Sequence, residues 1–323
     1  MESTTSRSAA HRQTGYIAEP PLDSPESLPL PPLTADLSQA KEDVRVTGVC
    51  RLTGVLSSDE LEALRAKLDR QAAAERALGE LAPEGSQGTK QLVMNMVNKG
   101  QVFRDLIVRP EVDAFAGMLL GKDFLLSSIT GGSHYGSTSE AQVLHRDQGQ
   151  VPASIGMPAA CQIFWLLDDF TPARGGTWLV PGSHRWPAIH QIKPPDREAA
   201  VQVEAPAGSL VVWDARIWHS AGANPEGHPR RHISTFFCLP WMRPQENWGI
   251  SCLQEVLDEA SPTLKVRLGL KTYGTLGQVN GTATGQDNIS LGSDPVIFPD
   301  YIIGEHASLH PLRRVSRAVV SEG

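Results

Sequence analysis

Two stretches in the first third of the chain place their apolar residues at helical spacing. In residues 57–85, leucines recur three and four positions apart, and Ser57 with Glu60 matches a capping box at the start. Gly79 offers an end for this helix. Residues 110–121 open with proline and close with glycine, which favour the first position and the end of a helix. We therefore predict two helices before the middle of the chain.

From about residue 123 the pattern changes to short apolar runs separated by turn residues. The runs are DFLLSSIT, AQVLHRD, AACQIFWLLDDF, TWLV, AGSLVVWDARIW and RRHISTFFCLPW. Runs of this length and spacing are typical of the strands of a β-sandwich or barrel. Residues 250–272 return to a helical pattern. The sequence therefore predicts a mostly β protein with flanking helices and a double-sheet core over about residues 123–245.

The first 42 residues differ from the rest of the chain. They are polar and rich in proline, with six prolines between Pro20 and Pro32. Such a segment has too little apolar area to offset the entropy lost on ordering. We expect residues 1–42 to form a disordered or draped arm and residues 43–323 to form a single domain.

Composition narrows the class of protein. A net charge of −7 gives no basic stripe for nucleic acid and no polybasic patch for a membrane. No apolar run approaches the ~20 residues of a membrane span, and the first 15 residues lack the apolar core of a signal peptide. The four cysteines lie far apart without a C-x-x-C pair, which argues against a disulfide framework and a structural zinc cluster. We expect a cytoplasmic protein.

Candidate metal ligands lie in the segment QVLHRDQGQ, residues 142–150. On a strand, residues two apart face the same way, so His145 and Asp147 would both face into the barrel while Arg146 faces out. Such a triplet also arises by chance, and it needs a third ligand from another strand. The best candidate is His219, at the end of the run GSLVVWDARIW. Two imidazoles and one carboxylate form the facial triad of non-haem Fe(II) oxygenases, which leaves three metal positions open.

An oxygenase of this type needs a source of two electrons, usually 2-oxoglutarate. The far carboxylate of 2-oxoglutarate requires a bidentate cation, and arginine supplies that fork better than lysine. Arg230 and Arg231 follow His219 by eleven and twelve residues. On a strand they face opposite sides, so only one can bind the carboxylate. The periodicity of the neighbouring residues does not decide between them.

Four segments carry a resemblance to a known family. QVLHRDQ, GGTWLVPGSHRW, GSLVVWDARIWHSAGAN and PRRHIS follow one another between residues 142 and 234. In this order they resemble the phytanoyl-CoA dioxygenase family of Fe(II)/2-oxoglutarate-dependent oxygenases, especially its members that tailor small molecules. The resemblance implies a double-stranded β-helix, the cupin-like jelly roll, with the metal between its two sheets.

The resemblance also assigns roles to individual residues. The implied iron ligands are His145, Asp147 and His219. Arg230, which follows proline in PRRHIS, is implied to hold the far carboxylate of 2-oxoglutarate, with Arg231 as the alternative. Gln142 and Thr177 match positions that hydrogen-bond the carboxylates of the co-substrate.

The implied activity is oxidation of a small molecule by dioxygen, with release of succinate and CO2. Hydroxylation is the simplest outcome, while desaturation, epoxidation and cyclisation use the same triad. Asp147 argues against a halogenase, because related halogenases have a small residue there. We see no basic cluster for the phosphates of a CoA thioester, and therefore expect a small, fairly apolar substrate of the natural-product type. A homodimer is compatible with the sequence, which does not fix the oligomeric state.

Two other functions remain open from the residues alone. The same three ligands also bind zinc, which would activate water for hydrolysis. That alternative leaves Arg230 and Thr177 without a role. The other alternative is a non-catalytic jelly-roll binding module.

Among the remaining histidines, we expect a structural role for His184, and we expect His190, His228 and His232 to lie in loops or face solvent.

Overall fold

Two antiparallel β-sheets form the centre of the computed structural model, which describes residues 19–79, 90–134 and 141–278. The larger sheet has the strand order β1-β7-β4-β9-β3-β2. Its strands are β1 (Val49–Leu52), β2 (Lys90–Val93), β3 (Leu125–His134), β4 (Ala160–Leu166), β7 (Leu210–Asp214) and β9 (Arg230–Cys238). The smaller sheet, ordered β6-β5-β8, contains β5 (Trp178–Leu179), β6 (Val201–Gln202) and β8 (His219–Ser220). This double-sheet core confirms the predicted fold class.

Helices precede and follow the β core. The α-helices are α1 (Leu37–Thr47), α2 (Ser58–Leu78), α3 (Gln101–Ile107), α4 (Pro110–Leu120), α5 (Trp248–Ser251), α6 (Gln254–Glu259) and α7 (Pro262–Arg267). The 3-10 helices are η3 (Met96–Asn98), η4 (Pro172–Arg174), η5 (Ser183–Arg185), η6 (Ala188–Gln191) and η7 (Arg197–Ala199). None of the helices in the described ranges is long and apolar enough to cross a membrane.

The two helices expected from the sequence form for the expected reasons. Helix α2 starts with a capping box, in which the Ser57 side chain accepts from the Glu60 N–H and the Glu60 carboxylate accepts from the Ser57 N–H. Gly79 ends it in the left-handed conformation, with φ of 73°. Pro110 occupies the first turn of α4, and Gly121 caps its end.

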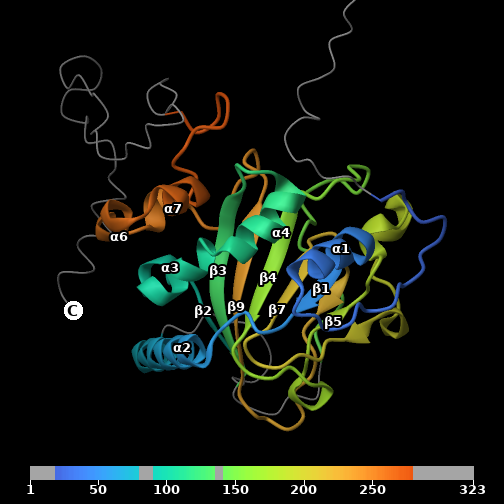
Figure 1. Ribbon diagram of the computed structural model, residues 1–323, viewed down its shortest axis with the longest axis horizontal. Helices are drawn as coiled ribbons and strands as arrows, with labels where there is room; N and C mark the ends of the chain where they lie inside the picture. The colour runs from blue at the N-terminus through green and yellow to red at the C-terminus, as the bar shows by residue number, and fades with distance from the viewer. Residues whose placement is uncertain (1–18, 80–89, 135–140, 279–323) are drawn as a thin grey trace, which may run out of the picture.

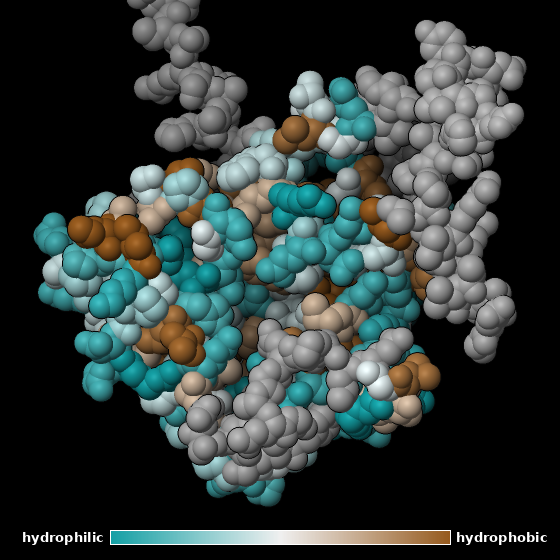
Figure 2. Space-filling model, turned by 180° about the vertical axis from the view of Figure 1, so that it is seen from behind, coloured by the Kyte–Doolittle hydropathy of each residue, from teal (hydrophilic) through white to brown (hydrophobic). Residues whose placement is uncertain are grey.

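Helices cover one face of the larger sheet, and Figure 1 shows α1 and α4 lying in front of the strands. Apolar side chains of α2 and α4, such as Leu68 and Phe115, form one buried core with residues of β4 and β9, such as Ile163 and Phe237. The opposite side of the molecule has mixed polar and apolar patches around a central hollow (Figure 2). The helix-covered face is therefore the main hydrophobic core, and the other face is left for a site.

Strand β9 is covered on both of its faces. Ile233 and Phe237 belong to the core beneath the helices, while Ser234 and Phe236 line a cavity on the other face. Burial on both faces explains why hydrophobic periodicity along this strand assigns no inward side.

Two details of the predicted strands are wrong. Residues 141–147 do not form a strand, and within them only His145 makes a β-bridge, to His219. His219 does not end the strand that contains Trp213. Strand β7 stops at Asp214, whose carboxylate accepts hydrogen bonds from the backbone and side chain of Arg216. This turn breaks the apolar run, and the chain then enters the smaller sheet at His219.

The described part of the arm, residues 19–36, lies on the domain in an extended conformation. Leu22 and Leu28 donate backbone hydrogen bonds to the carbonyl groups of Arg185 and Pro181. Arg51 in turn donates to the carbonyl group of Pro31. Helix α1 begins at Leu37, six residues before the predicted start of the domain at residue 43. The boundaries at residues 42 and 43 stay a prediction.

His184 is a titratable group buried in this framework. Its side chain lies against the turn after α1, where a Cβ on Gly48 would come within 2.5 Å of Nδ1. Burial, together with the neighbouring Arg216 and Arg185, lowers the pKa of His184 to about 3, against the opposing effect of Asp214. The imidazole is therefore neutral in the folded protein, in agreement with the structural role expected for it.

We predict that His184 makes the fold sensitive to acid. An unfolded histidine titrates near 6.5, so between pH 6.5 and about 3 the unfolded chain binds more protons than the folded chain. The contribution of His184 to the free energy of unfolding is fully present above pH 6.5. Below pH 6.5 it falls by about 1.4 kcal/mol per pH unit, so that roughly 2 kcal/mol is lost at pH 5. His184→Phe removes this dependence, which urea unfolding at pH 7 and pH 5 measures. Equal pH dependence in the variant and the parent would refute the prediction, and exposed His190→Phe is the control.

Candidate active site

The three predicted metal ligands lie together at the cavity between the two sheets. His145 Nε2 is 3.8 Å from Asp147 Oδ1, and His219 Nε2 is 3.4 Å from Asp147 Oδ2. One ligand atom from each residue lies within 4.8 Å of the other two. The three donors therefore surround one point from one side, as a facial triad does.

Backbone hydrogen bonds create this arrangement. The His145 N–H donates to the His219 carbonyl group over 2.8 Å, and the His219 N–H donates back over 2.9 Å. The two imidazole rings consequently lie 4.3 Å apart, centre to centre. Asp147 follows at the start of a turn, where Gln148 donates to the Ala215 carbonyl group. These hydrogen bonds thus hold the segment around His145 and the segment around His219, which are distant in sequence, in a fixed register.

The orientation of each imidazole suits coordination through Nε2. His145 Nδ1 lies 3.2 Å from the Val143 carbonyl oxygen, and His219 Nδ1 lies 3.0 Å from that of Ile217. A carbonyl oxygen accepts, so Nδ1 carries the proton and the lone pair is on Nε2, which faces Asp147. Burial lowers the pKa of His219, against the attraction of Asp147, and keeps this ring neutral. The donor set therefore fits a divalent metal ion such as iron.

The two candidate arginines have different surroundings. Arg230 is 2% exposed and lines the same cavity as the triad, with its guanidinium 5.2 Å from the ring of Phe170. Arg231 points to the other face and pairs with Asp168 at 2.8 Å and with Asp69 at 2.6 Å. Burial lowers the pKa of Arg230 to about 10, so its side chain stays charged at neutral pH. Of the two arginines, Arg230 is the one that shares a cavity with the metal ligands.

Both other predicted co-substrate residues also line this cavity. Thr177 is buried directly before β5, and its carbonyl group accepts from Val203. The Gln142 side chain accepts from the Ala221 N–H at 3.4 Å, and its backbone pairs with the same residue. The sequence prediction therefore placed all six site residues around one cavity of about 280 Å³.

His232 is a site residue that the sequence analysis missed. It was expected in a loop or facing solvent, but it is buried and lines the cavity two residues after Arg230. Its ring stacks on Phe164 at 4.4 Å, and Gly132 lies opposite on β3. A Cβ at Gly132 would come within 2.2 Å of the His232 ring, so this position needs glycine. The alternation from Arg230 along β9 is the signal that could have located His232.

Comparisons with known proteins agree with this site. The sequence model of the family Phytanoyl-CoA dioxygenase (PhyH) matches residues 44–232, more than half of the chain. The chain belongs to the phytanoyl-CoA dioxygenase family. It is accordingly a 2-oxoglutarate-dependent non-haem iron dioxygenase with iron and 2-oxoglutarate as cofactors, as the sequence predicted. This membership decides against the zinc hydrolase and the binding module.

Individual proteins to which this chain is similar include a dioxygenase and a non-heme alpha ketoglutarate dependent enzyme. "Dioxygenase af480" from Aspergillus fumigatus is 29% identical over 252 residues, covering 75% of this chain and 80% of that protein. The crystal structure of the non-heme alpha ketoglutarate dependent epimerase SnoN from nogalamycin biosynthesis has a TM-score of 0.52 and 25% identity, covering 63% of this chain and 83% of SnoN. EctD from S. alaskensis, at 17% identity and a TM-score of 0.55 over 73% of this chain and 91% of its own, shows the fold alone. The jelly-roll prediction is confirmed.

Removal of the carboxylate at position 147 tests the metal site. We predict that Asp147→Ala weakens binding of Mn(II), used as a stand-in for Fe(II), by at least about 100-fold, because loss of even an outer partner of a ligand costs 10–100-fold. Calorimetric titration of the purified protein measures this affinity. Asp169→Ala is the matched control, since the exposed Asp169 carboxylate accepts from the Ala207 N–H and does not line the cavity among the residues that the structure describes. Unchanged Mn(II) affinity in Asp147→Ala would rule out this residue as a ligand.

Proposed function

We propose that His145, Asp147 and His219 bind Fe(II) and that Arg230 binds the far carboxylate of 2-oxoglutarate. The observation that carries this proposal is the single cavity that contains the triad and a buried arginine. Bound iron supplies the redox chemistry between dioxygen, 2-oxoglutarate and the substrate. Thr177 and Gln142 complete the co-substrate site by hydrogen bonding to its carboxylates.

The protein positions Arg230 for this role by three means. The strand register places it opposite His134 on β3, at the first position of β9. The ring of Phe170 supports the guanidinium from one side. On the outer face, Arg231 anchors the start of β9 through Asp168. A guanidinium held this way loses little conformational freedom when it binds a carboxylate. It therefore favours a co-substrate with a second carboxylate over one without it.

The part of the cavity beyond the cofactor residues supports a neutral substrate with both apolar and oxygen-bearing groups. The apolar lining residues include Leu92, Met94, Phe164, Trp213 and Phe236, and the neutral polar ones include Ser128, Thr130, Gln162, Ser234 and Gln245. Two of these polar pairs are already hydrogen-bonded, Gln162 to Ser234 and Ser128 to Gln245. Apolar walls with a few positioned polar groups are typical of small-molecule sites.

A CoA thioester does not suit this cavity. Among the described residues that line it, the cations are Lys90 and Arg230, and Arg230 is engaged by the co-substrate in our proposal. One lysine is too few for the several phosphate groups of CoA. The relationship to SnoN, an enzyme from nogalamycin biosynthesis, supports a natural-product substrate instead.

We propose hydroxylation as the reaction. One oxygen atom of O2 enters a C–H bond of the substrate to give an alcohol, and the other enters 2-oxoglutarate, which leaves as succinate and CO2. Asp147 supports hydroxylation over halogenation, since the carboxylate occupies the position that a halide would need. The residues that line the cavity hold the substrate and exclude bulk water, which limits side reactions.

Mass analysis of the product tests the reaction class. We predict that a neutral polycyclic metabolite with hydroxyl or carbonyl groups stimulates oxygen uptake by the Fe(II)- and 2-oxoglutarate-supplied enzyme, and that the product gains one oxygen atom. Loss of two hydrogens would indicate desaturation, and an unchanged mass with altered stereochemistry would indicate epimerisation; either result contradicts hydroxylation. Stimulation by acyl-CoA esters alone would contradict the proposed substrate class.

Replacement of each arginine separates their roles. Arg230→Gln should raise the 2-oxoglutarate concentration needed for half-maximal succinate formation by at least about 30-fold, because truncating a buried charge partner costs roughly 2–5 kcal/mol. Arg231→Gln should instead lower the free energy of unfolding by about 1–3 kcal/mol, since it leaves the 10%-exposed Asp168 side chain with only its more distant arginine, Arg65, among the described residues. Initial rates against 2-oxoglutarate concentration and urea unfolding measure the two effects. The opposite pattern would transfer the role to Arg231.

A further inference from the structure

A second cavity, also about 280 Å³, lies directly behind the metal-binding segment. His145 and Asp147 line the active-site cavity. The residue after each of them, Arg146 and Gln148, lines the second cavity. The alternation of side chains along this segment therefore divides it between two cavities. The proposed function leaves the second cavity without a role.

Arg146 brings an uncompensated charge to this cavity. Its Nη1 donates to Gln191 Oε1 at 2.8 Å, and its guanidinium lies 5.1 Å from the ring of Trp218. No carboxylate of the described ranges pairs with it. Burial lowers the pKa of Arg146, and the like charge of Arg216 lowers it further. A half-buried cation without a carboxylate partner is a binding group for an anion.

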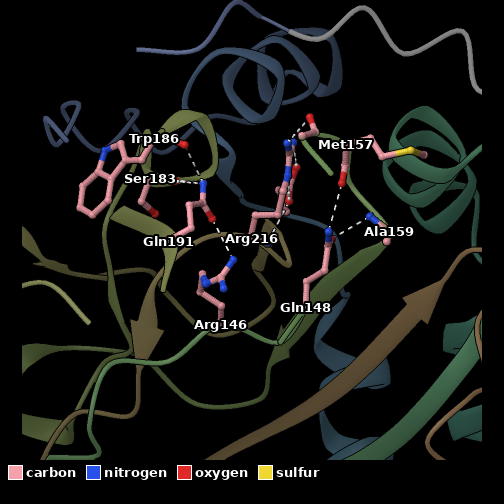
Figure 3. A network of polar contacts seen from close by, with 10 residues as sticks. Arg146, Gln148, Met157, Ala159, Ser183, Trp186, Gln191 and Arg216 are labelled. Carbon is pink, nitrogen blue, oxygen red and sulfur yellow. Dashed lines mark hydrogen bonds and ion pairs between the residues drawn. The ribbon is translucent and has the colours of Figure 1, made fainter. Parts of the chain in front are cut away.

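The other charged groups around the cavity do not supply the missing anion. Asp214 is engaged by Arg216, through bonds of 2.6 and 2.9 Å. Glu19, at the rim, pairs with Arg45. Figure 3 shows Arg146 bonded to Gln191, with Arg216 nearby and with Gln148 bonded to Met157 and Ala159 beside them. The carboxylates of Asp214 and Glu19 are thus each paired with an arginine other than Arg146.

Buried polar atoms without partners mark the same region. Arg146 Nε makes no hydrogen bond within the part of the chain that the structure describes, and neither does Nε1 of Trp218, whose ring lies against the Arg146 guanidinium. His184 lines the cavity and is 3% exposed. Buried polar groups are nearly always satisfied by protein, water or a ligand, so a cluster of such atoms beside a cavity indicates a bound species.

The remaining walls are apolar and the space is large. Val151, Pro152, Ile155 and Pro187 contribute apolar surface. The volume is several times the roughly 30 Å³ share of a water molecule, so a simple inorganic anion would fill only part of it. Arg185 and Arg216 also line the cavity, but Arg185 donates to the carbonyl groups of Pro20 and Val46 and Arg216 is bonded to Asp214. The Arg146 guanidinium beside an apolar wall matches an acid group on an apolar body.

We propose that this second cavity binds a small organic carboxylate, whose acid group pairs with Arg146 and whose apolar part lies against Val151, Ile155 and Pro187. Gln191 orients the guanidinium from the other side. The site is independent of the proposed function, because it needs neither metal nor 2-oxoglutarate.

Calorimetric titration with benzoate tests this proposal on the metal-free full-length protein, without 2-oxoglutarate. Saturable binding is expected, with benzamide at least ten-fold weaker because it lacks the charge. Arg146→Gln should weaken benzoate binding at least ten-fold. Arg243→Gln is the matched control, since Arg243 is exposed and lines neither cavity. Ala188→Phe, at the exposed rim of the second cavity, should block benzoate while leaving Arg146 in place.

Arg230→Gln distinguishes the two arginine sites. If Arg230→Gln abolishes benzoate binding and Arg146→Gln and Ala188→Phe do not, benzoate binds only in the active site and the proposal is wrong. Absence of saturable binding also overturns it, as does phosphate binding as tightly as benzoate, which would indicate an inorganic-anion site. Circular dichroism of each variant establishes that the fold is retained.

Discussion

Two reciprocal backbone hydrogen bonds between His145 and His219 are the constraint on which the site depends. They join a short segment outside the larger sheet to a two-residue strand of the smaller sheet. With this bridge in place, the neighbouring carbonyl groups set both imidazole tautomers and direct Nε2 of each ring toward Asp147. A triad of side chains is thus positioned by main-chain geometry, which tolerates little displacement.

The larger sheet supplies the complementary part of the site through the alternation of β9. Arg230 and His232 face the cavity, and Arg231 between them ties the strand to Asp168 on the outer face. The metal-binding segment has the same two-sided character, with Arg146 facing a second cavity. In both places, adjacent residues serve different functions because successive side chains point to opposite faces.

Sequence alone predicted much of this structure. The double-sheet core and the capped helix α2 follow from patterning and turn chemistry, and the six residues that the motifs point to line one cavity. It could not choose between Arg230 and Arg231, because both faces of β9 are buried and carry apolar residues. It placed His219 at the end of the wrong strand, because the Asp214–Arg216 turn is a tertiary feature inside an apolar run.

The most direct test of this account is a crystal structure of the protein with Mn(II) and 2-oxoglutarate. The account predicts one metal ion bound by His145 Nε2, the Asp147 carboxylate and His219 Nε2, and a 2-oxoglutarate molecule whose far carboxylate contacts Arg230. A metal ion bound elsewhere, or a far carboxylate that contacts Arg231 on the opposite face of the sheet, would contradict it.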